Sequence, residues 1–208
     1  MNRYTHKILD HLPSVPEHFL HEAQILAQTQ PEDRQKNTTL NSYNPTFKTR
    51  VLTINGQQTP TARAKRFIVS KDFQEWIQNN IAADFVEASV SITESQRDGV
   101  ATAIHGAHTD WSRTFVLMYV MDTGGAQCET VFYQEHDQPI WRTDLGCFVT
   151  DYSRLTEIDS VTIPLATWYS IDSTVLHGVR NIERDRVAIH VGLQGSDQSI
   201  IKSTVSHV

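Results

Sequence analysis

The sequence predicts a mainly β fold with flanking helices, built around a jelly-roll core. From about position 86 onward, β-branched and aromatic residues occur in short runs separated by Gly, Asp and Asn, and two amphipathic helical patterns precede them. Many short strands at close spacing, punctuated by glycine turns, are typical of a sandwich or barrel. Because the helices come first and the strands follow, we expect the helices to cover one outer face of the sheets.

The length of 208 residues fits one domain with a substantial core. We therefore expect a single domain over residues 1–208. In it, a helical and irregular N-terminal part, about 1–85, would pack on a β core that spans about 86–208.

Two helices are predicted in the N-terminal part. The first begins with an apparent capping box from Ser14 to Glu17, in which Pro16 presets the helical φ. The second begins at Ser70 as N-cap, with Asp72 at the positive end of the helix dipole. Each pattern carries one apolar face. These faces consist of Phe19, Leu20, Ala23 and Ala27 in the first helix, and Phe73, Trp76, Ile77 and Ile81 in the second.

Eight strands are predicted after the helices. They are Ala88–Thr93, Gly99–Ile104, Thr114–Met121, Glu129–Gln134, Leu145–Thr150, Ser160–Ile163, Trp168–Ile171 and Arg186–Leu193. In the last strand the odd positions from Val187 to Leu193 are all apolar, whereas the even positions include Arg186 and His190. If the apolar face packs under the helices, Arg186 points into a polar pocket for an anion, because burying an unpaired charge is costly. The alternative is a solvent-exposed Arg186, or an ordinary ion pair with Asp172 or Glu183.

Composition excludes several classes of function. The chain has 18 Lys and Arg against 24 Asp and Glu, a net charge of −6, without a basic stripe, so nucleic acid is not expected as a partner. No stretch approaches the roughly 20 apolar residues of a membrane helix, and the N-terminus lacks the apolar run of a signal peptide. We therefore expect no membrane partner and a cytoplasmic location. The sequence is silent on the oligomeric state.

Three residues form a candidate metal site. His108 and Asp110 lie two residues apart, so on an extended backbone both side chains point to the same side. His177 follows later in the chain. Two imidazoles and one carboxylate on one face of an ion leave adjacent positions open, as in non-haem Fe(II) oxygenases. Either motif alone also occurs by chance or as a turn, and their combination with a later arginine, Arg186, strengthens the metal prediction.

Two segments carrying these residues, 105–134 and 168–193, resemble the 2-oxoglutarate/Fe(II)-dependent dioxygenase superfamily, in particular its small single-domain members related to prolyl hydroxylases. The resemblance implies a double-stranded β-helix. It also implies that His108, Asp110 and His177 are catalytic iron ligands, and that Arg186 pairs with the distal carboxylate of 2-oxoglutarate. Gly124 and Gly125 fit the family's turn. The implied reaction consumes O2 and releases succinate and CO2, and Asp110 favours hydroxylation over halogenation.

Further candidates lie near these residues. Tyr119 and His190 are candidates for binding 2-oxoglutarate, against the alternatives of plain packing for Tyr119, which shares the parity of its apolar neighbours, and of a satisfied core histidine for His190. His105, Trp111 and Arg113 are candidates for binding the substrate, against the alternative of an ordinary turn or a solvated loop.

The sequence therefore predicts an Fe(II)- and 2-oxoglutarate-dependent hydroxylase of a small polar molecule or a peptide side chain. Two alternatives stay open. One is a non-catalytic jelly-roll module that binds an acidic ligand, and the other is a metal-dependent enzyme that does not use 2-oxoglutarate. The identity of the substrate is not encoded in any recognisable motif.

Overall fold

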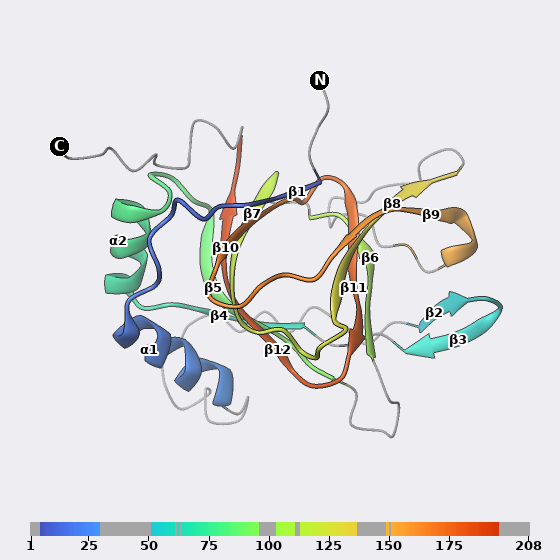
Figure 1. Cartoon of the computed structure of the whole chain (residues 1–208), viewed down its shortest axis with the longest axis horizontal. Helices are drawn as coiled ribbons and strands as arrows, with labels where there is room; N and C mark the ends of the chain where they lie inside the picture. The colour runs from blue at the N-terminus through green and yellow to red at the C-terminus, as the bar shows by residue number, and fades with distance from the viewer. Residues whose placement is uncertain are drawn as a thin grey trace.

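The computed structural model describes residues 5–29, 51–60, 62, 64–95, 103–110, 113–136, 149 and 151–195. Two antiparallel sheets face each other, and two helices, α1 (Glu17–Gln28) and α2 (Lys71–Asn80), lie outside one of them (Figure 1). This arrangement confirms the predicted mainly β fold with flanking helices.

The larger sheet has six strands. In spatial order they are β1 (His6–Ile8), β10 (Trp168–Asp172), β7 (Phe115–Asp122), β12 (Arg186–Leu193), β5 (Glu87–Thr93) and β4 (Ala64–Ile68). The smaller sheet has four strands. They are β6 (Ala103–His108), β11 (Leu176–Ile182), β8 (Glu129–Glu135) and β9 (Leu155–Val161), in that spatial order.

The chain crosses repeatedly between the two sheets. Strands β5, β7, β10 and β12 belong to the larger sheet, and β6, β8 and β11, which lie between them in sequence, belong to the smaller one. This alternation is the connectivity of a jelly roll. A separate hairpin of β2 (Val51–Ile54) and β3 (Gln57–Pro60) projects to one side, and the short 3-10 helix η2 (Tyr152–Arg154) precedes β9 (Figure 1).

The two helices cover the outer face of the larger sheet. The rings of Phe19 in α1 and Phe73 in α2 stack with their centroids 4.4 Å apart. Both belong to one buried cluster with Ile189, Val191 and Leu193 of β12. The odd positions of β12 therefore pack beneath the helices, as their alternation predicts.

The two helix starts differ in their capping. Ser70 caps α2, because its hydroxyl accepts a hydrogen bond from the Phe73 N–H at 3.3 Å. The carboxylate of Glu22 in α1 accepts from both the N–H and the hydroxyl of Ser70, at 2.6 and 2.7 Å, and so ties the helices together. The capping box predicted for α1 is not formed: Pro16 itself occupies the N-cap position, and no side chain caps it.

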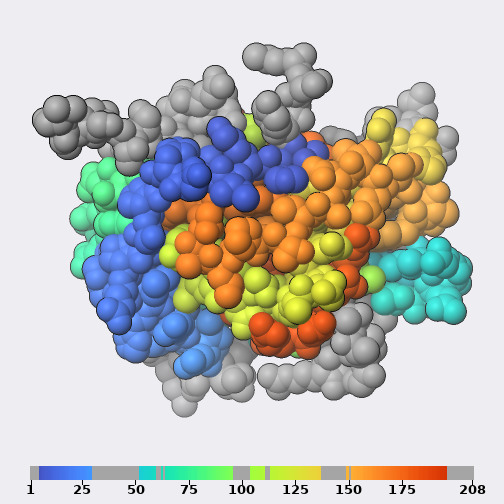
Figure 2. Space-filling view, in the orientation of Figure 1, coloured from blue at the N-terminus to red at the C-terminus, as the bar shows by residue number. Residues whose placement is uncertain are grey.

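The N-terminal part is more regular than the sequence predicts. It supplies β1 and β4, the two edge strands of the larger sheet, as well as the hairpin. Near its start the chain lies along β10, where the Leu9 N–H donates to the carbonyl of Trp168 at 2.9 Å. The indole of Trp168 donates back to the carbonyl of Pro13, also at 2.9 Å. Figure 2 shows this N-terminal segment in blue across the surface of the strands. Short polar edge strands lack the apolar alternation by which strands are recognised.

The strand predictions after position 86 have mixed outcomes. Most match observed strands, but the sequence missed β11, and the run predicted at Ser160–Ile163 overlaps only the end of β9. Residues 99–102 and most of 145–150 lie outside the described residues. No helix in the described part of the chain is both long and apolar enough to cross a bilayer.

Candidate active site

A pocket lies between the two sheets and offers about 600 Å³ of space, part of it open to solvent. Its walls combine side chains from both sheets. The polar residues among them are Arg66, Ser91, Thr93, His105, His108, Asp110, Thr130, His177, Arg186 and His190. The structure therefore brings together the three candidate metal ligands and the candidate 2-oxoglutarate arginine in one pocket.

The two histidines of the candidate metal site are neighbours. His108 on β6 and His177 on β11 occupy directly paired positions, and their ring centroids are 4.5 Å apart. Each Nδ1 lies 2.9 Å from a backbone carbonyl, that of Gly106 for His108 and that of Val175 for His177. Because a carbonyl only accepts, each Nδ1 must carry the proton, which leaves the lone pair of the neutral ring on Nε2.

Both rings are neutral at physiological pH. Burial lowers the pKa of His177 and places that of His108 well below its ordinary value, and the positive charge of the other ring adds to the effect at His108. A neutral imidazole oriented through Nδ1 by a carbonyl is the form in which histidine coordinates a metal through Nε2.

A β-bulge brings a third histidine to the pocket. His177 of β11 pairs with His108 of β6, and Val179 pairs with His105. Two steps along β11 therefore span three steps along β6, which is the mark of a β-bulge. In a regular strand His105 and His108 would point to opposite faces. The bulge turns both toward the pocket, with ring centroids 4.8 Å apart. Burial lowers the pKa of His105 to about 4, against a backbone hydrogen bond to Ala62.

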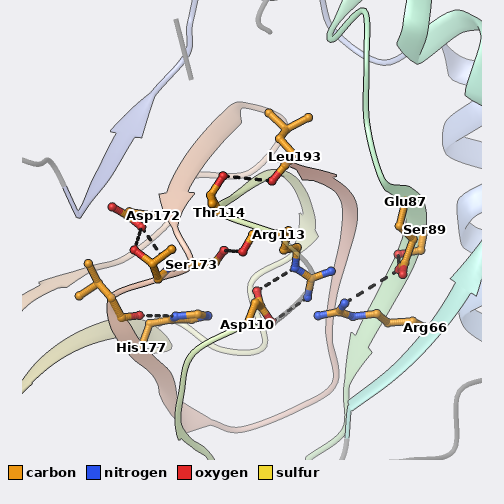
Figure 3. Close-up of polar contacts among 12 residues, drawn as sticks. Arg66, Glu87, Ser89, Asp110, Arg113, Thr114, Asp172, Ser173, His177 and Leu193 are labelled. Atoms are coloured by element: carbon orange, nitrogen blue, oxygen red, sulfur yellow. Dashed lines mark hydrogen bonds and ion pairs between the residues drawn. The ribbon is translucent and has the colours of Figure 1, made fainter. Parts of the chain in front are cut away.

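Asp110 forms a bidentate ion pair with Arg113 (Figure 3). The Arg113 Nε lies 2.8 Å from one carboxylate oxygen and Nη2 lies 2.9 Å from the other. Both side chains are at least nine-tenths buried. Burial alone would raise the pKa of Asp110, but the guanidinium of Arg113 outweighs it and holds that pKa well below its usual range. Asp110 is therefore an ionised carboxylate.

These donors suit a divalent metal in kind and protonation state. The set contains two neutral imidazoles and one carboxylate, and each oxygen of an ionised carboxylate keeps a second lone pair beside its bond to Arg113. Among the described residues, however, no group of three His, Cys, Asp or Glu side chains is close enough together to hold an ion. The carboxylate of Asp110 is engaged by Arg113 instead.

Arg186 points into the pocket and not to solvent. Its two terminal nitrogens each lie 3.2 Å from the Thr130 hydroxyl, and its side chain is buried. Within the described part of the chain it pairs with no carboxylate, so the alternative of an ion pair with Asp172 or Glu183 is not what the structure shows. A buried guanidinium whose side-chain partners, Thr130 and Cys128, include no carboxylate is suited to receive an anion.

The predicted glycine turn sets the position of Arg186. Gly124 has a φ of +83°, and a Cβ there would lie 2.9 Å from the Cβ of Arg186. The carbonyl of Gly124 accepts from the N–H groups of Glu183 and Arg184, at 2.8 and 2.9 Å. Glycine is therefore required here both for the backbone conformation and for the approach of β12.

The other predicted site residues lie in different environments. His190 lines the pocket, and its Nδ1 is buried without a hydrogen-bond partner among the described residues. Tyr119 lies on the opposite face of the sheet, where its ring packs 5.3 Å from that of Trp168 in the core under the helices. It follows the apolar parity of its neighbours, and the predicted role in binding 2-oxoglutarate is not supported. Arg113 pairs with Asp110, and Trp111 lies outside the described residues.

Thr130 and Arg66 are among the pocket residues that sequence reasoning missed. Thr130, the partner of Arg186, has no motif around it. Arg66 enters from edge strand β4, in a part of the chain assigned no strand. Two glycines in the sequence could have indicated the bulge. The first is Gly106, which interrupts a strand pattern. The second is Gly178, where a Cβ would lie 2.7 Å from the carbonyl oxygen of His105.

Comparisons with known proteins found distant structural similarity only. No family model and no curated protein matches the chain. One similar solved structure is the epimerase SnoN in complex with Fe3+, alpha ketoglutarate and nogalamycin RO, which is 14% identical over 89% of this chain and 76% of that chain, with a TM-score of 0.43. Another is an oxidoreductase of the 2OG-Fe(II) oxygenase family from Burkholderia pseudomallei, which is 9% identical over 90% of this chain and 97% of that chain, with a TM-score of 0.39.

Proposed function

We propose that the chain is an Fe(II)- and 2-oxoglutarate-dependent dioxygenase, a small single-domain member of that superfamily, which hydroxylates an organic substrate with release of succinate and CO2. One observation carries the proposal. His108, Asp110 and His177 line the same pocket as Arg186, a buried guanidinium that pairs with no carboxylate in the described part of the chain.

His108, Asp110 and His177 would hold the metal. The carbonyls of Gly106 and Val175 keep both Nδ1 atoms protonated, so each Nε2 is available as a donor. Arg113 keeps Asp110 ionised and fixes its orientation. When bound, Fe(II) would supply the redox chemistry that couples consumption of O2 and 2-oxoglutarate to oxidation of the substrate.

Arg186 would bind the distal carboxylate of 2-oxoglutarate. Its planar fork suits a carboxylate in two parallel hydrogen bonds, and Thr130 braces it from the side. The pocket is also lined by apolar side chains, among them Ala188, Val116 and Met118. The distal carboxylate of the dianion would therefore bind to Arg186, in a pocket lined by both polar and apolar side chains.

The proposal is tested by succinate release. Purified protein with Fe(II), ascorbate and 2-oxoglutarate should form succinate slowly without substrate, and His177→Ala should form none. The matched control is His136→Ala, a histidine whose Nε2 contacts the Thr156 hydroxyl outside the pocket, and it should retain the rate. Equal succinate formation in the protein and in His177→Ala would contradict the proposal.

One observation favours a second candidate function, a non-catalytic pocket for an acidic ligand. Both oxygens of Asp110 are already engaged by Arg113, and Arg66 and Arg186 add positive charge to the same pocket. Such a module would bind 2-oxoglutarate equally well with or without Fe(II). Binding that is independent of the metal would therefore favour it over the dioxygenase.

A further inference from the structure

The guanidinium of Arg66 is an additional cation in the pocket. Arg66 is paired with Ser91 of β5, which is itself paired with Ala188 of β12. These three residues therefore form one row across the sheet and share its pocket face, and all three line the pocket. The neighbouring residue Phe67 points to the other face, into the core under the helices.

Arg66 is incompletely satisfied by the protein. Its Nε is buried and has no hydrogen-bond partner among the described residues. Among the described residues its nearest carboxylate is that of Glu87, at 3.9 Å from Nη1, which is beyond hydrogen-bond reach. Glu87 already accepts a hydrogen bond from Ser89 at 2.7 Å. A buried donor without an acceptor costs about 1–3 kcal/mol, so an acceptor supplied by a ligand would be favourable.

The charged groups in and around the pocket have a net positive charge, which one more negative group would balance. Arg113 forms an ion pair with Asp110 at contact distance, and under the proposed function Arg186 would bind one of the two carboxylates of 2-oxoglutarate. The three guanidinium groups exceed the two carboxylates of Asp110 and Glu87 by one positive charge. Because Fe(II) and the dianionic co-substrate cancel each other, this surplus would persist in the loaded enzyme.

Arg66 lies toward the metal end of the pocket. Figure 3 shows its side chain reaching from β4 toward the pair of Asp110 and Arg113. Strand β5 separates Arg66 from Arg186, so their backbones are roughly 10 Å apart across the sheet. An anion at Arg66 would therefore be a different group from the carboxylate at Arg186, and it would lie near the place where a substrate must approach the metal.

We infer that Arg66 anchors a carboxylate of the substrate, so that the substrate of this chain is an organic acid bound as a monoanion. This inference rests on the proposed dioxygenase function and names its substrate class. The planar fork of Arg66 would receive the carboxylate, and the remainder of the substrate would extend toward His108 and Asp110.

The test uses N-acetylglycine as the carboxylate probe and N-acetylglycinamide as its neutral match. Each is titrated by calorimetry into anaerobic protein that holds Fe(II) and saturating 2-oxoglutarate, which fills the position at Arg186. The acid should bind saturably, and the amide should not. Arg66→Gln should weaken binding of the acid by about tenfold or more, because a charge-assisted bidentate contact is lost. Arg66→Lys should give an intermediate affinity.

Lys65→Gln provides the matched control. Lys65 is adjacent on β4, pairs with Glu94 and does not line the pocket, so its replacement should leave the affinity unchanged. Equal binding of the acid by Arg66→Gln, equal binding of the amide, or no saturable binding of the acid by the unsubstituted protein would overturn the inference. A visible band from Fe(II) and 2-oxoglutarate should form in Arg66→Gln as in the unsubstituted protein. Its absence from both would contradict the proposed function alone, and the titration would still decide whether Arg66 is an anion site.

Discussion

The eight residues of β12 point alternately to its two faces, and these faces contact different environments. The outward face, with Ile189, Val191 and Leu193, is completely buried among apolar side chains of the helices and the sheet. The inward face, with Arg186 and His190, lines a polar pocket in which the buried Nδ1 of His190 has no hydrogen-bond partner among the described residues. The first face stabilises the fold, whereas the second is costly until a ligand binds. Substitutions on the two faces should therefore affect different properties.

The largest effect is expected from the outer layer. Phe73→Ala removes a fully buried ring stacked on Phe19, and it should lower the free energy of unfolding by about 3–5 kcal/mol. Chemical denaturation followed by tryptophan fluorescence measures this loss. Ile25→Ala, at an exposed position of α1, should cost little by comparison. A loss below about 1 kcal/mol for Phe73→Ala would contradict the assignment of the outer face as the main core.

The second largest effect is expected on the inward face of β12, where a substitution should change ligand affinity but not the free energy of unfolding. Arg186→Ala should weaken binding of 2-oxoglutarate by about 100-fold or more, because a buried charge-assisted contact is lost. It should not lower the free energy of unfolding, because it removes a buried charge without a carboxylate partner. Titration with 2-oxoglutarate and denaturation measure the two quantities. Arg184→Ala, which removes an exposed arginine paired with Asp122, is the control. A large loss of stability with unchanged affinity would reverse the contrast between the faces.

A smaller effect is expected at the residue that braces Arg186. Thr130→Val keeps the shape of the side chain but removes the hydroxyl that accepts from both Arg186 nitrogens. Affinity for 2-oxoglutarate should fall by about fivefold, which corresponds to a loss of about 1 kcal/mol. Thr130→Ser keeps the hydroxyl and should restore most of the affinity. If valine and serine variants bind alike, the hydroxyl does not position Arg186.

An effect of similar, small size is expected at the cap of α2. Ser70→Ala removes the acceptor for the Phe73 N–H and one donor to Glu22, and it should cost about 1 kcal/mol of stability. Ser70→Asp should recover the capping bond but not the contact with Glu22, since two carboxylates would meet there. Neither variant should change the affinity for 2-oxoglutarate. A change in that affinity would show that the outer layer and the pocket are coupled.

The features of the fold and site that could be predicted depend on local sequence patterns. Strict alternation in β12 predicted its apolar face, and it placed Arg186 on the opposite face, where the alternatives were a polar pocket and solvent or an ordinary ion pair. The two-residue spacing of His108 and Asp110 predicted that both side chains can reach one metal ion, and both line the same pocket. Ser70 was recognised as a cap because its role depends only on the next turn of helix.

The remainder depends on contacts between distant segments. Arg66 lies on an edge strand whose pairing with β5 is not visible in its own five residues. The direction of His105 depends on a β-bulge, which breaks the alternation by which side chains are assigned to the two faces of a strand. Tyr119 followed the packing parity of its strand and not the proposed role. The pairing of Arg113 with Asp110 needed the turn beyond β6, whose geometry is not encoded in strand alternation.

The most direct test of the dioxygenase function is the visible spectrum of the protein with Fe(II) and 2-oxoglutarate under anaerobic conditions. We predict a weak charge-transfer band that requires both components and is lost in Asp110→Ala and His177→Ala, with circular dichroism showing that both variants remain folded. Absence of the band from the folded, unsubstituted protein, or its survival in Asp110→Ala, would contradict the assignment of the pocket as an iron and 2-oxoglutarate site.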